Sequence, residues 1–177
     1  MKGDLPAGEE DRGRSPRTIE TLSVLIGVIS DTHNLLRPEV LTALKRSKLI
    51  LHAGDVCRPE VLEELGRIAP IVAVRGNNDR GAWARRLPVS RTVEVGGFRI
   101  HILHDLKELD VDPRAEGFHA VVSGHSHRPG AHRRNGVLFL NPGSAGPRRF
   151  KLPVAVAHLG VGERGLRARI VEVGASD

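Results

Sequence analysis

The chain has 177 residues, of which 40% are hydrophobic and 3% aromatic, and its formal net charge is +6. This length fits one domain with a sizeable core, and the single cysteine excludes an intrachain disulfide and a cysteine-based zinc cluster. No apolar run approaches the roughly 18–20 residues of a membrane span, and the polar N-terminus does not resemble a signal peptide. We therefore expect a cytoplasmic protein without a membrane partner.

The two ends of the chain differ from the middle in composition. Residues 1–21 are rich in charged residues and glycine and offer almost no apolar surface to bury, which predicts a disordered tail. Residues 22–177 are then expected to form a single domain. Residues 128–177 carry nine basic and three acidic side chains, which would suit an anionic partner but is more commonly a solvated surface. The sequence is compatible with a homo-oligomer and does not decide the point.

The first half of the domain alternates strand-like and helix-like segments. Continuous apolar runs at 24–30, 49–55 and 71–77 predict strands that are buried on both faces. The segments between them, 38–47 and 59–68, each begin with proline, which is favoured in the first turn of a helix. This order predicts a βαβαβ unit with a parallel sheet.

The second half is richer in strands. Residues 90–105 predict two strands joined by a Gly96-Gly97 turn, and a helical stretch is expected around 106–117. Further strands are predicted at 120–126, 136–144, 154–162 and 166–174. These are too many strands for one sheet. We therefore predict an α/β fold in which two mixed β-sheets pack face to face with helices outside.

Polar side chains that can bind a metal ion follow five of these apolar runs. The ends of parallel strands gather at one edge of a sheet, where ligand sites form, so we expect these side chains to share one crevice. Carboxylates, imidazoles and a carboxamide are metal ligands, and seven of them are enough for two divalent ions. The candidate ligands are Asp31, His33, Asp55, Asn77, His104, His125 and His127.

Each motif has an ordinary explanation when it is taken alone. Asp-x-His occurs by chance, Gly-Asp after a strand is usually a turn, and Gly-Asn-Asn-Asp suits a turn with left-handed asparagines. A lone His104 could equally be a hydrogen-bonded core histidine. The order of the motifs, with each candidate at a predicted strand end, is what favours a site.

This ordered set, "DTH", "GD", "GNND", "LH" and "GHSH" with a trailing "NPGS", resembles the calcineurin-like metallophosphoesterase superfamily. It is most similar to the small bacterial and archaeal phosphodiesterase branch, to which the eukaryotic retromer scaffold subunit is also similar. The resemblance covers about residues 23–174. It implies a four-layer αββα sandwich and identifies residues 22–177 as a metallophosphoesterase domain.

The resemblance also implies two divalent-metal sites that share one carboxylate. Asp31, His33 and His127 would hold the first metal, Asn77, His104 and His125 would hold the second, and Asp55 would bridge them. Mn²⁺ is the first expectation, with Zn²⁺, Fe²⁺, Ni²⁺, Co²⁺ and Mg²⁺ as alternatives. Asp55, Asn77 and Asn78 are the residues expected to take part in catalysis.

The expected activity is hydrolysis of a small phosphodiester, in which a hydroxide held between the two metals attacks phosphorus in line with the leaving group. One alternative is a protein-interaction scaffold that keeps the fold and has lost turnover. Another is a small nuclease, which the basic C-terminal third would suit but the scarcity of aromatic residues disfavours.

Two positions depart from the family pattern. Asn78 stands where the wider family has a histidine, and its side chain cannot act as a general acid at neutral pH. Asp105 stands where the small branch more often has glycine, and its carboxylate either supports a ligand or points away. Two other residues are expected to play structural parts, His52 as a packing or supporting residue and Cys57 as a small apolar filler.

Overall fold

The structure is a computed structural model that describes residues 24–149 and 151–174. The disordered tail expected at residues 1–21 lies outside the described residues. The described residues form two five-stranded mixed sheets, which confirms the two-sheet fold predicted from the sequence.

The first sheet has the strand order β10-β9-β1-β2-β3. Its strands are β1 (Val24–Ile29), β2 (Leu49–His52), β3 (Ile71–Ala73), β9 (Ala155–Gly162) and β10 (Gly165–Glu172). The β1, β2 and β3 strands run parallel, as the βαβαβ pattern predicted, and β9 and β10 are added antiparallel to β1. This arrangement brings the carboxyl ends of β1, β2 and β3 to the same edge.

The second sheet has the order β4-β5-β6-β8-β7. Its strands are β4 (Ser90–Val95), β5 (Phe98–Leu103), β6 (Ala120–Val122), β7 (Gly130–Arg134) and β8 (Val137–Asn141). The predicted hairpin is present, because β4 and β5 pair antiparallel across Gly96 and Gly97, which both have positive φ. The β5, β6 and β8 strands are parallel, so the ends of β5 and β6 also lie at one edge.

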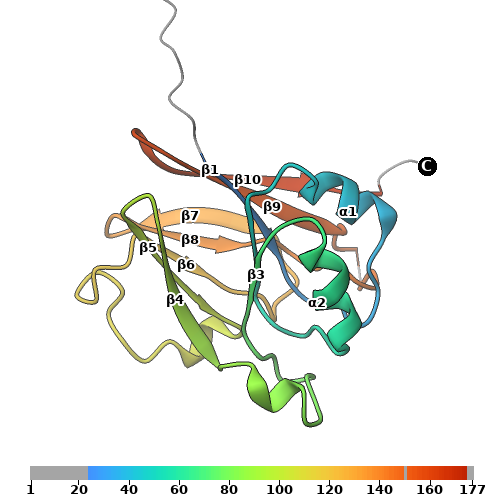
Figure 1. The fold of residues 1–177 in the computed structure, drawn as a ribbon. Helices are drawn as coiled ribbons and strands as arrows, with labels where there is room; N and C mark the ends of the chain where they lie inside the picture. The colour runs from blue at the N-terminus through green and yellow to red at the C-terminus, as the bar shows by residue number, and fades with distance from the viewer. Residues whose placement is uncertain (1–23, 150, 175–177) are drawn as a thin grey trace, which may run out of the picture.

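The main core lies between the two sheets, and a second cluster lies under two helices. Apolar side chains from the inner faces of both sheets form one buried cluster that includes Ile26, Val28, Ile100, Ile102 and Leu140. The helices α1 (Pro38–Leu44) and α2 (Pro59–Gly66) cover the outer face of the first sheet. They lie on the same side of that sheet in Figure 1. In each helix, buried residues four positions apart face the sheet.

The segment that covers the outer face of the second sheet is not the helix that the sequence predicted. Where a helical stretch was predicted around 106–117, the chain has one short 3₁₀ helix, Leu106–Glu108, followed by turns. Asp105 and Asp112 each accept the backbone N–H two residues ahead, and such local bonds compete with helix formation. The segment still carries Leu109 and Phe118 onto the sheet, where they join Leu103 and Val121 in a small cluster.

The β7 strand was not predicted. It is an edge strand that pairs only with β8, through a turn at Asn135 and Gly136, and all but its first residue are exposed. An exposed polar strand has no apolar alternation, so the pattern gave no indication of it.

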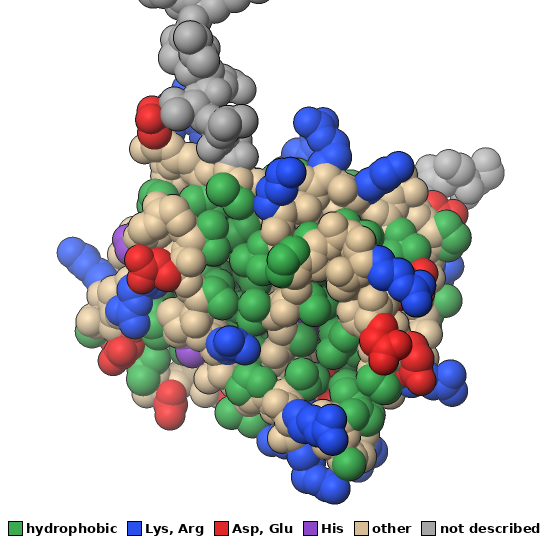
Figure 2. Space-filling view, viewed as in Figure 1, with side chains coloured by type: hydrophobic (Ala, Val, Ile, Leu, Met, Phe, Trp, Pro, Cys, Tyr) green, Lys and Arg blue, Asp and Glu red, His purple; other side chains and the backbone are tan. Residues whose placement is uncertain are grey.

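None of the helices among the described residues is long and apolar enough to cross a membrane. On the face drawn in Figure 2, apolar side chains occupy the centre, and the Lys and Arg side chains of the described residues are dispersed around it. The basic side chains visible on that face therefore do not make one continuous stripe.

Candidate metal centre

The seven candidate ligands all lie just beyond strand ends, and the structure brings them together. Asp31 and His33 follow β1, Asp55 follows β2, Asn77 follows β3, His104 follows β5, and the two histidines of the GHSH motif follow β6. The first three strands belong to one sheet and the last two to the other. The site is therefore built where the edges of the two sheets meet, and neither sheet could form it alone.

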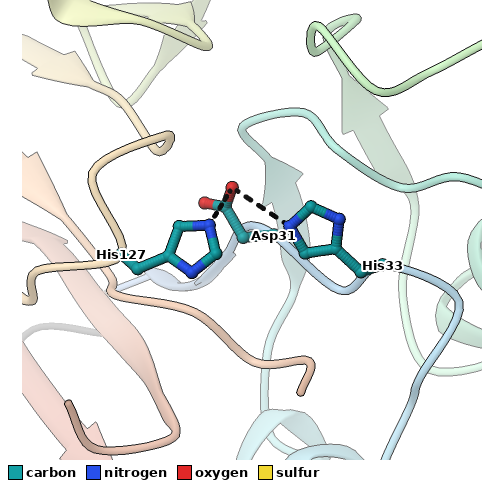
Figure 3. A group of neighbouring side chains, drawn as sticks. All are labelled: Asp31, His33 and His127. Carbon is teal, nitrogen blue, oxygen red and sulfur yellow. Dashed lines mark ion pairs between the residues drawn. The ribbon is translucent and has the colours of Figure 1, made fainter. Parts of the chain in front are cut away.

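The first group is formed by Asp31, His33 and His127. Asp31 Oδ1 lies 3.2 Å from His127 Nε2 and 3.9 Å from His33 Nε2. Figure 3 shows the carboxylate pointing into the space between the two rings, one carried by the loop after β1 and the other by the loop after β6. One ligand atom from each of the three side chains lies within 4.8 Å of the other two, a spacing that could hold one ion.

Asp55 connects this group to the second one. Its Oδ2 lies 3.7 Å from His33 Nε2 and 3.5 Å from His104 Nε2. Asp31, Asp55 and His104 also satisfy the same 4.8 Å spacing. A carboxylate that faces a ligand of each group has the position expected of a bridge.

The second group contains Asn77, His104 and His125. Asn77 Oδ1 lies 3.0 Å from His104 Nε2 and 3.1 Å from His125 Nδ1. His104 is buried, whereas the side chain of His125 is 42% exposed. The second group therefore opens toward solvent, beside a hollow of about 250 Å³ that it lines together with Arg75 and Glu108.

The backbone at the site is unusual. Five of the seven candidate ligands have left-handed backbone, with φ between 44° and 64°: Asp31, His33, Asp55, His125 and His127. Residues other than glycine rarely adopt this conformation, which costs of order 1–3 kcal/mol at each position and persists only where the surroundings enforce it. Such strain is characteristic of functional sites, where the chain must aim side chains in fixed directions.

Glycines keep backbone close to the ligands. A Cβ at Gly76 would collide with the backbone N and the carboxylate of Asp55, and a Cβ at Gly124 would collide with the side chains of Ser30 and Asp31. Glycine at these two places lets the loops after β3 and β6 approach the carboxylates directly. The two motif glycines thus have a steric role that does not depend on turn conformation.

Asp79 is a functional residue whose role the sequence reasoning missed. Its buried carboxylate accepts three backbone N–H groups, from Gly76 at 2.7 Å, from Cys57 at 2.6 Å and from Asp55 at 3.0 Å. Burial raises the pKa of this carboxyl group, and these hydrogen bonds oppose the rise. Asp79 therefore ties the loop after β2 to the loop after β3. In the sequence, the indication of this role was the position of Asp79 as the fourth residue of the GNND motif. The motif does not reveal which backbone N–H groups the carboxylate binds.

His52 has the supporting role that the sequence suggested as one of two alternatives. It is fully buried, and burial lowers its pKa to about 4, so the ring is neutral. Gly54 N–H donates to Nδ1 at 3.2 Å, which leaves the proton on Nε2 to be donated to the Thr32 hydroxyl at 3.1 Å. Thr32 can then donate to the carbonyl of Val56 at 3.3 Å. This relay joins the loops that carry Asp31 and Asp55.

Several acceptor atoms at the centre of the site face no hydrogen-bond donor within residues 24–149 and 151–174, which favours a bound cation there. Asp31 Oδ1 and His33 Nε2 are buried without a hydrogen-bond partner in the described part of the chain. His104 donates Nδ1–H to the carbonyl of Ala53 at 2.7 Å, so Nε2 of the neutral ring faces the Asn77 oxygen as a second acceptor. Burial would lower the pKa of His104, but its bonds to Asp55 and Ala53 outweigh it and raise the pKa to about 9. Without a metal, a proton must lie between His104 Nε2 and Asn77 Oδ1 to satisfy them. A bound metal ion would satisfy both of these acceptor atoms instead.

The carboxylates are held in their charged forms. Burial would raise the pKa of Asp31, but the nearby His127 ring and the hydrogen bond from Ser30 outweigh it and hold the pKa below its ordinary value. Burial also opposes ionisation of Asp55, and bonds from His104 and Asn78 lower its pKa strongly. Divalent cations bind deprotonated carboxylates and neutral imidazoles, so the donor set fits two N/O-ligated ions.

Two further side chains lie beside the ligands. Cys57 is half-buried and its Sγ lies 3.7 Å from His33 Nδ1, so the thiol contacts a candidate ligand where the sequence suggested an apolar filler. Burial raises its pKa to about 11, with Asp79 and Asp55 adding to the effect, and the group is a neutral thiol. Asp105 does not point away, because its Oδ2 lies 3.6 Å from His125 Nε2. His101, by contrast, stacks on Phe118 at 4.6 Å, away from the ligands.

Comparisons with known proteins agree with this geometry. The sequence profile of the calcineurin-like phosphoesterase superfamily domain matches residues 24–164. A protein named "Probable metallophosphoesterase" from Methanothermobacter thermautotrophicus is 37% identical over 164 residues, which cover 86% of this chain and 94% of that protein. These matches confirm the resemblance that the motifs indicated.

Two solved structures share the fold. An archaeal phosphodiesterase superposes with a TM-score of 0.71 at 22% identity, over 84% of this chain and all (100%) of that one. Vacuolar protein sorting 29 from Cryptosporidium parvum superposes with a TM-score of 0.70 at 21% identity, over 86% of this chain and 98% of that one. At these identities the likeness concerns the fold alone.

Proposed function

This chain belongs to the calcineurin-like phosphoesterase superfamily, and we propose that it is a phosphodiesterase that uses two divalent cations. The observation that carries the proposal is one continuous set of contacts. Successive neighbours lie within 3.9 Å of each other along the order His127, Asp31, His33, Asp55, His104, Asn77 and His125. Such a set of acceptors, two of which are buried and have no hydrogen-bond partner among the described residues, suits bound cations.

Each ligand has a proposed part in this site. Asp31, His33 and His127 hold one cation, Asn77, His104 and His125 hold the other, and Asp55 binds both. When bound, two such ions would supply an activated water molecule and charge stabilisation for the phosphoryl oxygens. Mn²⁺ is the proposed occupant; the carboxylate and carboxamide oxygens suit it, and the imidazoles suit Zn²⁺ or Fe²⁺ equally.

The charge of the site favours an anionic substrate. Two divalent ions bring four positive charges, and the two carboxylates that bind them, Asp31 and Asp55, return two negative ones. The remaining positive charge attracts a phosphate ester. The second group is the open side of the site, so the substrate would approach past His125 and Asn77, both of which are exposed.

Asn77 and Asn78 are the proposed contacts to the reacting phosphoryl group, alongside Asp55 as the shared ligand. Asn78 already donates its side-chain amide to Asp55 Oδ2 at 2.6 Å. A carboxamide can orient a neighbour or donate a hydrogen bond, but it cannot deliver a proton to a leaving group. A diester with a leaving group that is stable as an anion is therefore the proposed class of good substrate.

A scaffold without turnover is the second candidate function, because Vacuolar Protein Sorting 29 shares the fold. One experiment separates the two. Purified protein would be loaded with Mn²⁺, its bound metal counted, and its hydrolysis of bis(4-nitrophenyl) phosphate measured with and without a chelator. We expect about two ions per chain and turnover that the chelator abolishes.

Asp55→Ala is the decisive variant and Glu63→Ala its control, since Glu63 is an exposed acidic residue on α2. Asp55→Ala should reduce occupancy of both sites and lower kcat/KM by more than the roughly 10- to 100-fold that is typical for loss of a residue that only supports a metal ligand. Glu63→Ala should match the wild type. Full metal occupancy and wild-type turnover in Asp55→Ala would refute the proposed bridge. Two bound ions with no turnover of any phosphodiester in the wild type would favour the scaffold.

A further inference from the structure

His125 is the proposed ligand whose ring is least constrained by packing. Its side chain is 42% exposed, whereas that of His104 is 4% exposed. The backbone of His125 is fixed, because it has a φ of 64° and its N–H donates to Asp31 Oδ2 at 3.1 Å. Besides an edge-to-face contact with the His104 ring at 5.2 Å, the groups that orient the ring are therefore the polar ones at its two nitrogens.

Two groups face the two nitrogens of this ring. Nδ1 lies 3.1 Å from Asn77 Oδ1, on the side of the second group of ligands. Nε2 lies 3.6 Å from Asp105 Oδ2, on the opposite side. Asp105 is itself held in place, since its Oδ1 accepts the backbone N–H of Lys107 at 3.0 Å at the start of the 3₁₀ helix.

The neutral ring carries one proton, and its two possible positions differ in electrostatic energy. A proton on Nδ1 would be donated to the neutral Asn77 oxygen and would leave the lone pair of Nε2 facing the Asp105 carboxylate. A proton on Nε2 faces that full negative charge instead. It leaves the lone pair of Nδ1 facing the Asn77 oxygen at 3.1 Å, a repulsion that a cation bound between the two acceptors would remove. An N···O separation of 3.6 Å is an ion-pair contact and too long for a good hydrogen bond, but the attraction of a charge for an N–H dipole still acts at this distance.

We propose that Asp105 is a positioning residue, whose carboxylate keeps the proton of His125 on Nε2 and leaves Nδ1 free to bind the second cation. This inference rests on the two-cation site proposed above. A histidine that binds metal through one nitrogen commonly gives its other N–H to a carboxylate, which sets the tautomer and increases the affinity for the metal.

The charges of the two groups give Asp105 a second effect. The first cation would have Asp31 as a carboxylate ligand of its own and would share Asp55. The second would have only the shared Asp55, because Asn77, His104 and His125 bind as neutral groups. Asp105 would add one negative charge near the second cation, separated from it by the imidazole ring of His125. Its loss should therefore weaken the second site selectively.

The test compares Asp105→Ala and Asp105→Asn with Glu108→Ala. Glu108 is the matched control, since it is an acidic residue that lines the same hollow. Mn²⁺ titrations of the full chain would give the affinities of the first and second equivalents. Two-bond ¹H–¹⁵N spectra of the metal-free protein at pH 8.5 would give the tautomer of His125 directly. This second readout depends neither on bound metal nor on turnover.

We expect the wild-type ring to carry its proton on Nε2. In Asp105→Ala the population should shift toward Nδ1, and the affinity for the second Mn²⁺ should fall by about 10- to 100-fold, with the first changed by less than about twofold. Asp105→Asn keeps the shape and an acceptor for Lys107, so it should fold even if Asp105→Ala does not and should show a smaller loss. Glu108→Ala should leave both readouts unchanged.

The possible failures are distinct. If Asp105→Ala and Asp105→Asn match Glu108→Ala in tautomer and in second-equivalent affinity, the role of Asp105 is wrong. If the wild type takes up one Mn²⁺ only, while the tautomer responds to Asp105 as expected, the two-cation function is wrong and control of the His125 ring by Asp105 is supported.

Discussion

Asn78 donates two hydrogen bonds to the carboxylate of Asp55, from its backbone N–H to Oδ1 at 2.8 Å and from its side-chain amide to Oδ2 at 2.6 Å. Asn78, which stands where the motif resemblance implies a histidine, is thus directed at the proposed bridging ligand. It orients Asp55 and lowers the pKa of its carboxyl group, and it offers no proton to a leaving group. The consequences for the reaction can be measured.

Hydrolysis should depend steeply on the leaving group in the wild-type protein. General acid help is worth roughly 10²–10⁴-fold and matters most for a poor leaving group, so aryl diesters should be cleaved far faster than alkyl diesters. Asn78→His should flatten the dependence by raising alkyl turnover more than aryl turnover. Asn78→Ala is the control, since it removes the amide without adding an acid and should stay steep. The measurement is kcat/KM over a graded series of diesters, and a flat wild-type series would contradict the assignment.

Asp79→Asn should destabilise the protein and disturb the metal site. The carboxamide keeps one acceptor oxygen but places an NH₂ group against at least one of the backbone N–H groups that Asp79 now satisfies. An unsatisfied buried donor costs about 1–3 kcal/mol, which corresponds to a fall in Tm of roughly 3–10 °C for a chain of this size.

The control for that change is Asp112→Asn, an exposed aspartate that accepts one backbone N–H at 3.0 Å. Its Tm should stay within about 1–2 °C of the wild type, because exposed substitutions usually change stability by less than about 0.5 kcal/mol. Equal Tm values for Asp79→Asn and the wild type would show that the three bonds contribute little to folding.

Gly76→Ala should abolish metal binding more completely than it unfolds the protein. The added methyl group would overlap the backbone and carboxylate of Asp55, so one of the two loops must move. Overpacking of this kind costs about 1–3 kcal/mol, and the displacement falls on the proposed bridge. Metal counting and thermal melting of the same sample would check both effects.

Gly66→Ala is the matched glycine for comparison. It ends α2, and a Cβ there would meet nothing within 4 Å. Restricting the unfolded chain should stabilise this variant by about 0.4–1 kcal/mol, and its metal content should be unchanged. Normal metal content in Gly76→Ala would mean that the loops have more room than the structure shows.

His52 should make the protein less stable as the pH falls. Its pKa is about 4 in the folded chain and about 6.5 when unfolded, so between these values the unfolded state binds the additional proton. Stability from this residue is therefore complete above pH 6.5 and declines toward pH 4. Each unit of pKa difference corresponds to about 1.4 kcal/mol, which gives a loss on the order of 3 kcal/mol by pH 4.

The measurement is the difference in unfolding free energy between the wild type and His52→Gln in a chelator, from pH 8 to pH 4. Subtraction removes the titration of the other site residues, which both proteins share. The difference should be largest at high pH and shrink as the pH falls, whereas the difference between the wild type and Gly66→Ala should stay constant. A His52→Gln difference that does not vary with pH would contradict the buried, neutral ring.

The sequence alone determined the two-sheet fold and the candidate ligands. Continuous apolar runs predicted the parallel strands because such strands are buried on both faces. Polar residues directly after those runs predicted a site because parallel strands end at one edge. These patterns are local, so they can be recognised along the chain. Two elements were predicted wrongly for the same reason. The β7 strand is an exposed polar edge strand without an apolar pattern. The segment after Asp105, predicted as a helix, forms turns through short side-chain hydrogen bonds to the backbone.

Only the tertiary structure decided which atoms meet. Asp105 faces a ring nitrogen of His125, which is twenty positions away in the sequence. Asp79 accepts the backbone N–H of Asp55, which is twenty-four positions away. Nothing in these spacings indicates either contact. Those contacts depend on how the edges of two sheets pack against each other and on left-handed loop backbone that the surrounding packing enforces. Ligand identity is local chemistry, whereas the hydrogen bonds that orient a ligand arise between segments brought together by the core.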